Sequence, residues 1–120
     1  MLPKVLILED DRQLNRLLRK GFETVNLTVV QAYSLAEAYS ALERENIAII
    51  VTDLGLPDGD GTELIDRVKT RSGGNCPKII VMTGRDINQN SYKGHDILQK
   101  PVNVTELIRL AIQVRYGRRI

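Results

Sequence analysis

Apolar runs alternate with amphipathic stretches along the whole chain. The runs at 4–8 (KVLIL), 47–52 (IAIIVT) and 78–83 (KIIVMT) are almost wholly apolar. Such runs are typical of strands that are covered on both faces of a sheet. Weaker strands are predicted at 27–32 and 97–99.

The stretches between these runs carry apolar residues at helical spacing. Helices are predicted over 11–24, 34–45, from about 60 to 69, and from 103 onward. The last three open with the capping-box sequences SLAE, DGTE and NVTE, which are typical of helix starts. In the first helix the predicted apolar stripe is Leu14, Leu17, Leu18 and Phe22. Strands that alternate with helices indicate an α/β fold with a doubly wound, five-stranded parallel sheet.

One interval departs from this alternation. Residues 84–96 (GRDINQNSYKGHD) are rich in poor helix formers and hold few sizeable apolar groups. A parallel crossover normally contains a helix. We expect the fourth helix of this fold to be shortened or replaced by a loop.

Composition bounds the class of protein. The 120 residues fit a single domain spanning 1–120, with 115–120 as a tail or the start of a linker. The formal net charge of +2 is too small to indicate direct binding of nucleic acid, and no apolar run approaches the ~20 residues of a membrane span. Cys76 is the single cysteine, which excludes an internal disulfide. We expect a cytoplasmic protein.

Polar residues follow the predicted strands. In parallel α/β sheets, ligands bind outside the carboxyl ends of the strands. These ends carry, in chain order, Glu9, Asp10, Asp11, Asp53, Thr83 and Lys100. The topology therefore predicts that residues more than ninety positions apart meet at one edge of the sheet.

The chemistry of this set points to phosphoryl transfer. Several carboxylates in one pocket raise each other's pKa unless a cation intervenes. Mg²⁺ suits one or two carboxylates together with water and phosphate oxygens. Lys100 offers a positive charge for a phosphate oxygen and Thr83 a hydroxyl donor. A carboxylate nucleophile among these groups is typical of a site where positioning and charge neutralisation provide most of the catalysis.

This arrangement resembles the response-regulator receiver family, whose fold is flavodoxin-like (CheY-like), over about residues 4–114. The resemblance rests on LILEDD at 6–11, TDLGLPDGDG at 52–61, VMTG at 81–84 and QKP at 99–101. It implies an acidic metal-binding pair, a phosphoacceptor that is also a metal ligand, a backbone carbonyl ligand, a switch hydroxyl and a phosphate-binding lysine. The matching residues are, in that order, Glu9 with Asp10, Asp53, Gly55, Thr83 and Lys100.

The resemblance also implies partners. A histidine kinase or histidine phosphotransfer protein would donate the phosphoryl group in a two-component phosphorelay, with Mg²⁺ as cofactor. A downstream protein target or output domain would read the changed surface, and the chain itself would not be an enzyme with turnover. The positions two after the phosphoacceptor and two after the hydroxyl, Gly55 and Arg85, would influence the lifetime of the phosphoryl group.

Two departures from the family pattern keep a second hypothesis open. The family usually has an aromatic residue three positions before the lysine, where this chain has Ile97. The atypical stretch 84–95 also falls where the family has its fourth helix. The alternative is a phosphorylation-independent protein-interaction module that uses the 84–97 region as its surface.

Other polar residues have simpler interpretations. Asp11 and Asp60 are expected to cap helices, and His95 and Cys76 to lie at the opposite end of the sheet from the acids. Asp58, Asp60 and Thr62 match a D-x-D-x-T phosphatase pattern, but the preceding strand ends at Asp53 instead. A hydrolase is therefore the third and weakest hypothesis.

Overall fold

The computed structural model describes residues 4–71, 76–84 and 96–116. Within these ranges a parallel sheet is formed by β1 (Lys4–Leu8), β2 (Val29–Ala32), β3 (Ile47–Asp53), β6 (Lys78–Thr83) and β7 (Asp96–Gln99). The strand order is β2-β1-β3-β6-β7. The predicted doubly wound α/β fold is confirmed.

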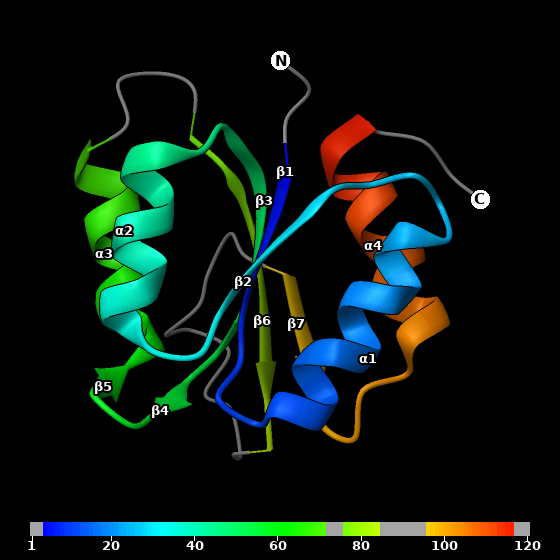
Figure 1. Cartoon of the computed structure of the whole chain (residues 1–120), viewed down its shortest axis with the longest axis horizontal. Coiled ribbons are helices and arrows are strands. Elements are labelled where there is room, and N and C mark those ends of the chain that lie inside the picture. Colours follow the sequence, from blue (N-terminus) through cyan, green and yellow to red (C-terminus); the bar gives the residue numbers. More distant parts are fainter. Residues whose placement is uncertain (1–3, 72–75, 85–95, 117–120) are drawn as a thin grey trace.

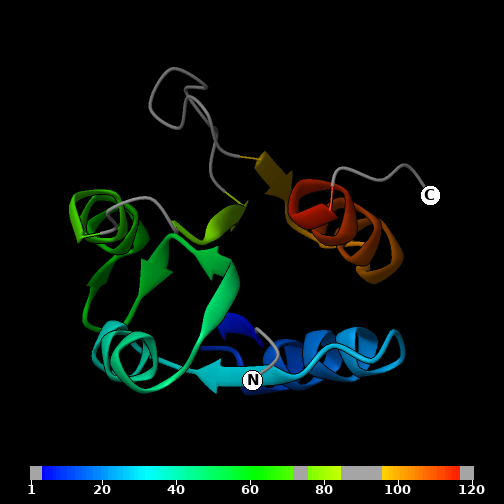
Figure 2. The same cartoon turned by 90° about the horizontal axis from the view of Figure 1, so that it is seen from above.

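Two pairs of helices cover the two faces of the sheet (Figures 1 and 2). Helices α2 (Leu35–Arg44) and α3 (Gly61–Arg71) lie on one face, and α1 (Arg12–Glu23) and α4 (Val104–Tyr116) on the other. Alternate residues of each strand point to opposite faces. Leu6, Leu8 and Ile50 therefore belong to the core under α2 and α3, and Val5, Ile7 and Ile49 to the core under α1 and α4.

Side-chain caps start the helices where the sequence predicts them. The Asp11 carboxylate accepts hydrogen bonds from Gln13 N and Leu14 N at 3.0 and 3.2 Å, which confirms its capping role. Ser34 Oγ accepts from Glu37 N at 3.3 Å, and Asn103 Oδ1 from Glu106 N at 3.1 Å. These bonds satisfy backbone N–H groups that have no partner within the helix.

A short antiparallel hairpin was not predicted. Strands β4 (Gly55–Leu56) and β5 (Gly59–Asp60) pair with each other, and we call residues 55–60 the β4–β5 hairpin. It joins the end of β3 to the start of α3 and lies beneath the first turns of α2 and α3 in Figure 1.

One predicted core position is wrong. Leu17 is 53% exposed, whereas Asn15 is fully buried in the same helix. The buried stripe of α1 contains Asn15, Leu18 and Phe22, a spacing of three and four residues that leaves Leu17 pointing to solvent. The predicted loop or short helix at 84–95, apart from Gly84, and the 117–120 part of the tail lie outside the described residues.

No helix in the described ranges is both long enough and apolar enough to cross a membrane.

Candidate functional site

The first part of the site is the acidic pair that follows β1. Glu9 is fully buried, and its Oε2 accepts a hydrogen bond from Asp11 N at 3.2 Å. Asp10 is exposed. Two neighbouring acids therefore have different surroundings: one is inside the protein and the other can meet a ligand from solvent.

The Asn15 side chain fixes the loop that carries Glu9 and Asp10. Its side-chain amide nitrogen donates to the backbone oxygen of Glu9 at 2.9 Å and to that of Ala32 at 3.1 Å. Its amide oxygen accepts from Gln31 Nε2 at 2.9 Å. Buried polar groups are normally paired in this way because desolvation without a partner is costly. Sequence analysis missed Asn15, although a polar residue on the buried stripe of a helix is a readable signal.

Asp53 is the last residue of β3, the central strand of the sheet. Its Oδ1 accepts hydrogen bonds from Leu54 N at 2.6 Å and Gly55 N at 3.4 Å. The carboxylate is only partly buried. One oxygen is thus fixed by the backbone that follows the strand, and the other faces the acidic pair and Lys100.

Lys100 links Glu9 and Asp53. Its Nζ donates to Glu9 Oε1 at 2.5 Å and to Asp53 Oδ2 at 2.8 Å. Its backbone N donates to the backbone oxygen of Thr83 at 2.8 Å, and the Thr83 side chain is buried at the end of β6. Parallel pairing of β6 with β7 therefore brings Lys100 to the same edge as Asp53.

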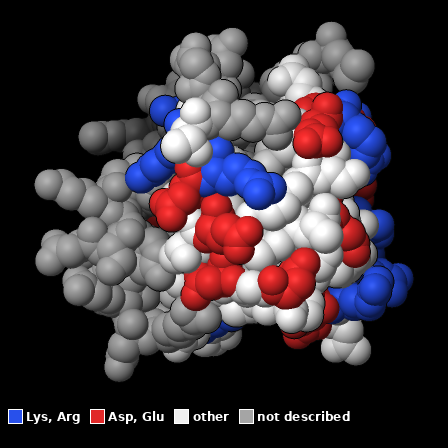
Figure 3. Space-filling model, turned by 90° about the vertical axis from the view of Figure 1, so that its left-hand side faces the viewer, with Lys and Arg blue, Asp and Glu red and all other residues white. Residues whose placement is uncertain are grey.

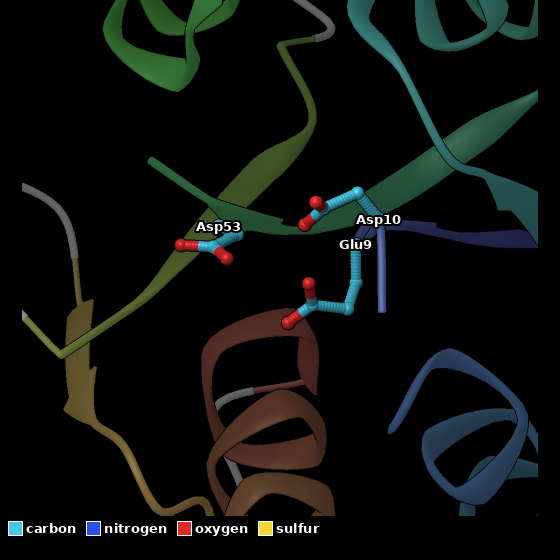
Figure 4. A group of neighbouring side chains, drawn as sticks. All are labelled: Glu9, Asp10 and Asp53. Carbon is cyan, nitrogen blue, oxygen red and sulfur yellow. The ribbon is translucent and has the colours of Figure 1, made fainter. Parts of the chain in front are cut away.

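The three carboxylates fit a hard divalent cation. Glu9, Asp10 and Asp53 each offer an oxygen, and these oxygens lie within 4.8 Å of one another. Figure 4 shows the three side chains facing a common space beyond the ends of β1 and β3. They carry three negative charges against the single charge of Lys100, and oxygen donors are those that Mg²⁺ prefers. A cation of charge +2 would balance the set.

Burial dominates the electrostatics of Glu9. It raises the pKa of this carboxyl above 4.5, the charge of Asp53 raises it further, and the hydrogen bond from Lys100 opposes both. The pKa of Lys100 is raised as well: its own burial acts to lower it, but the bonds to Asp53 and Glu9 outweigh that effect. Mutual repulsion of the carboxylates, which the sequence analysis expected to raise the pKa, does contribute at Glu9 through Asp53, but less than burial.

Asp58 lies apart from the acidic pair. Its two oxygens accept from Leu35 N at 2.8 Å and Ala36 N at 3.1 Å, at the start of α2. These backbone bonds lower its pKa. Asp60 Oδ1 accepts from Thr62 N at 2.9 Å at the start of α3. Both acids of the phosphatase-like pattern therefore bind helix starts instead of forming a nucleophile and acid pair.

The surface around this hairpin is acidic. Figure 3 shows acidic side chains grouped over the middle and lower part of the face formed by α2, α3 and the hairpin, with another acidic group near its upper edge and basic ones above and beside them. The exposed acids of these elements are Glu37, Glu43, Asp58, Glu63 and Asp66.

The structure brings together most of the predicted site. Glu9, Asp10, Asp53 and Lys100 meet directly, Thr83 lies beside Lys100, and Gly55 follows Asp53. Their chemical roles stay predictions. Cys76 is exposed, and His95 and Arg85 lie outside the described residues.

Comparison with known proteins gives a consistent result. The model of the response regulator receiver domain family matches residues 5–112. An uncharacterized 14.6 kDa protein of Leptolyngbya boryana is 36% identical over 91% of this chain and 87% of its own length. The swarming motility regulation protein RssB of Serratia marcescens is 31% identical over 87% of this chain, which spans only 49% of that relative.

Solved structures agree. A CheY-like response regulator receiver domain protein from Methanospirillum hungatei JF-1 superposes with a TM-score of 0.85 at 28% identity, covering 98% of this chain and 96% of that one. The receiver domain of a Francisella response regulator gives 0.83 at 27% identity, with 98% of each chain covered. With a family match over residues 5–112, a fold that superposes on solved receiver domains and an acidic cluster at the expected edge of the sheet, the chain belongs to the response regulator receiver domain family.

Proposed function

We propose that this receiver domain accepts a phosphoryl group on Asp53 in a Mg²⁺-dependent reaction. The observation that carries the proposal is the setting of the Asp53 carboxylate. One oxygen is held by two backbone N–H groups, and the other lies 2.8 Å from Lys100 Nζ. The Asp53 carboxylate is thereby oriented for attack on phosphorus. Lys100 lies beside it and can bind the negatively charged phosphoryl group as it arrives.

The donor would be a phosphohistidine of a histidine kinase or phosphotransfer protein. In the transfer, a P–O bond forms to an Asp53 oxygen while the P–N bond of the donor breaks, and the imidazole leaves with that electron pair. Lys100 would exchange its carboxylate partner on Asp53 for a phosphoryl oxygen, and Thr83 would donate its hydroxyl to another.

The metal site would be formed by Glu9, Asp10, Asp53 and the backbone carbonyl of Gly55. Bound there, Mg²⁺ supplies neutralisation of the charge on the phosphoryl oxygens. The oxygens of the three carboxylates lie within 4.8 Å of one another, which supports this assignment for Glu9, Asp10 and Asp53.

The output would be a changed surface that a downstream protein or an output domain reads, without turnover of a substrate. Half-buried Ile97 packs against the core beneath α2 and α3, so any relay from Thr83 here runs without an aromatic side chain at this position. A cytoplasmic location is part of the same proposal.

Intact mass measures the reaction directly. The protein is incubated with Mg²⁺ and a small acyl-phosphate donor, with Asp53→Asn as the matched control. We expect a gain of one phosphoryl group in the wild type, no gain in the variant, and no gain when EDTA removes the metal. No gain in the wild type, where a control receiver is modified, would refute the proposal and favour the phosphorylation-independent interaction module.

A further inference from the structure

The carboxylate of Asp58 joins two segments that are distant in the sequence. It accepts hydrogen bonds from Leu35 N and Ala36 N at 2.8 and 3.1 Å, and it lies 22 to 23 residues from them along the chain. The first N–H groups of a helix have no partner inside the helix. Asp58 therefore fastens the tip of the β4–β5 hairpin to the first turn of α2.

A direct packing contact supports this attachment. Gly59 has φ +154°, and a Cβ built on it would lie 2.7 Å from Leu35 Cδ1. Leu35 is itself buried in the core beneath α2 and α3. The hairpin thus lies against the first residue of α2, and a side chain on Gly59 would be strained at this φ and would require the Leu35 side chain to shift.

The other end of the hairpin is continuous with the phosphoacceptor. Gly55 pairs with Asp60 in the two-stranded ladder, and Gly61 N donates to the backbone oxygen of Leu54 at 2.8 Å. Gly55 N lies 3.4 Å from Asp53 Oδ1. A displacement of the tip would therefore be passed to Asp53 and Gly55 through a short, hydrogen-bonded unit.

We propose that Asp58 is a positioning residue for this pocket: by anchoring the hairpin to α2, it holds the Gly55 carbonyl and the Asp53 backbone in the geometry that binds Mg²⁺. The inference rests on the proposed function, because it concerns the same metal site. Coupling between two sites is reciprocal, so metal binding at Gly55 also stabilises the first turn of α2.

The test is the Kd for Mg²⁺, measured by isothermal titration calorimetry without any phosphoryl donor. Asp58→Ala is compared with Ser34→Ala, which removes the other side-chain cap of the same helix, a bond from Glu37 N at 3.3 Å. Both variants weaken the start of α2, but only Asp58→Ala releases the hairpin. Asp58→Asn keeps one acceptor oxygen and provides a milder variant, should the alanine variant not fold.

We expect Asp58→Ala to raise the Kd about tenfold, the lower end of effects from groups outside the ligand shell. Ser34→Ala should change it less than about twofold, because the hairpin keeps its anchor. In the wild type, the amide NMR signals of Leu35 and Ala36 should shift as Mg²⁺ is added.

The outcomes separate this inference from the function on which it rests. Equal Kd values for wild type and Asp58→Ala, or equal weakening by both alanine variants, would overturn the positioning role while leaving the metal site intact. Amide signals of Leu35 and Ala36 that do not shift when Mg²⁺ is added would also overturn the positioning role. A wild type that binds no Mg²⁺ would overturn the inference and the proposed metal site together.

Discussion

Gly61 occupies a position where a single methyl group should disturb the fold next to Asp53, the proposed phosphoacceptor. A Cβ at this position would lie 2.3 Å from the backbone oxygen of Asp53, 3.1 Å from Leu54 Cα and 3.2 Å from Asp53 C. All three neighbours are backbone atoms at the end of the central strand, which no rotamer change can move. Gly61→Ala is therefore a direct probe of the packing between the base of the hairpin and β3.

The expected change in the free energy of unfolding is the difference between the cost of overpacking and the gain from replacing glycine by alanine in a helix. Overpacking of a filled site costs about 1–3 kcal/mol, and contact with backbone favours the upper end. Alanine gains up to about 1 kcal/mol over glycine in a helix, and Gly61 is the first residue of α3. We expect a net loss of about 2 kcal/mol, which for a domain of this size lowers Tm by roughly 8 °C.

Gly84→Ala is the matched control. A Cβ at Gly84 would have no neighbour within 4 Å among the described residues, so the free energy of unfolding of this variant should stay within about 0.5 kcal/mol of the wild type. Urea and thermal unfolding of the three proteins measure the difference. A Gly61→Ala protein as stable as Gly84→Ala would refute the reasoning, since the backbone of Asp53 would then have shifted without any loss in the free energy of unfolding.

Three further predictions concern the charges and polar groups of the site. Lys100→Met leaves the buried Glu9 without its cation, and we expect urea unfolding in EDTA to show a loss of about 3 kcal/mol, the lower end for a broken buried pair because Lys100 is itself partly exposed. Mg²⁺ should restore part of this stability, and equal losses in EDTA and in Mg²⁺ would contradict the assignment. Because burial raises the pKa of Glu9 above 4.5, the folded state binds more protons than the unfolded state between the two pKa values. The stability of the wild type in EDTA should thus fall relative to Glu9→Gln as pH rises through that window, and a difference independent of pH would rule this out. Asn15→Leu removes two buried donations and should cost about 2–3 kcal/mol by urea unfolding, against about 1 kcal/mol for the more peripheral Gln31→Leu; similar losses would show that Asn15 has no special role.

The sheet was predictable because buried strands carry their own signal. The apolar runs 4–8 and 78–83 coincide with β1 and β6, and 47–52 falls one residue short of the end of β3. The rule that ligands gather at the carboxyl ends of parallel strands then placed Glu9, Asp53 and Lys100 together without knowledge of any distance. Weaker signals were less accurate: β2 begins at Val29, two residues later than predicted.

The features that were missed depend on tertiary contacts. Each strand of the β4–β5 hairpin has two residues, too few for any periodicity to appear in the sequence. Asp58 finds its partners on another helix, and nothing local distinguishes such a carboxylate from a solvated one. The burial of Glu9 against the exposure of Asp10 likewise follows from how the loop packs, since the two acids are neighbours of identical charge.

The position of Lys100 makes the charge balance of the acidic cluster depend on an edge strand. Its two carboxylate partners lie 91 and 47 residues earlier in the chain, after β1 and at the end of β3, whereas Lys100 follows β7, an edge strand of the described sheet. The hydrogen bond from Lys100 N to the backbone oxygen of Thr83 continues the pairing of β7 with β6. An edge strand is paired on one side only, so a change that loosens this pairing also removes the lysine from Glu9 and Asp53.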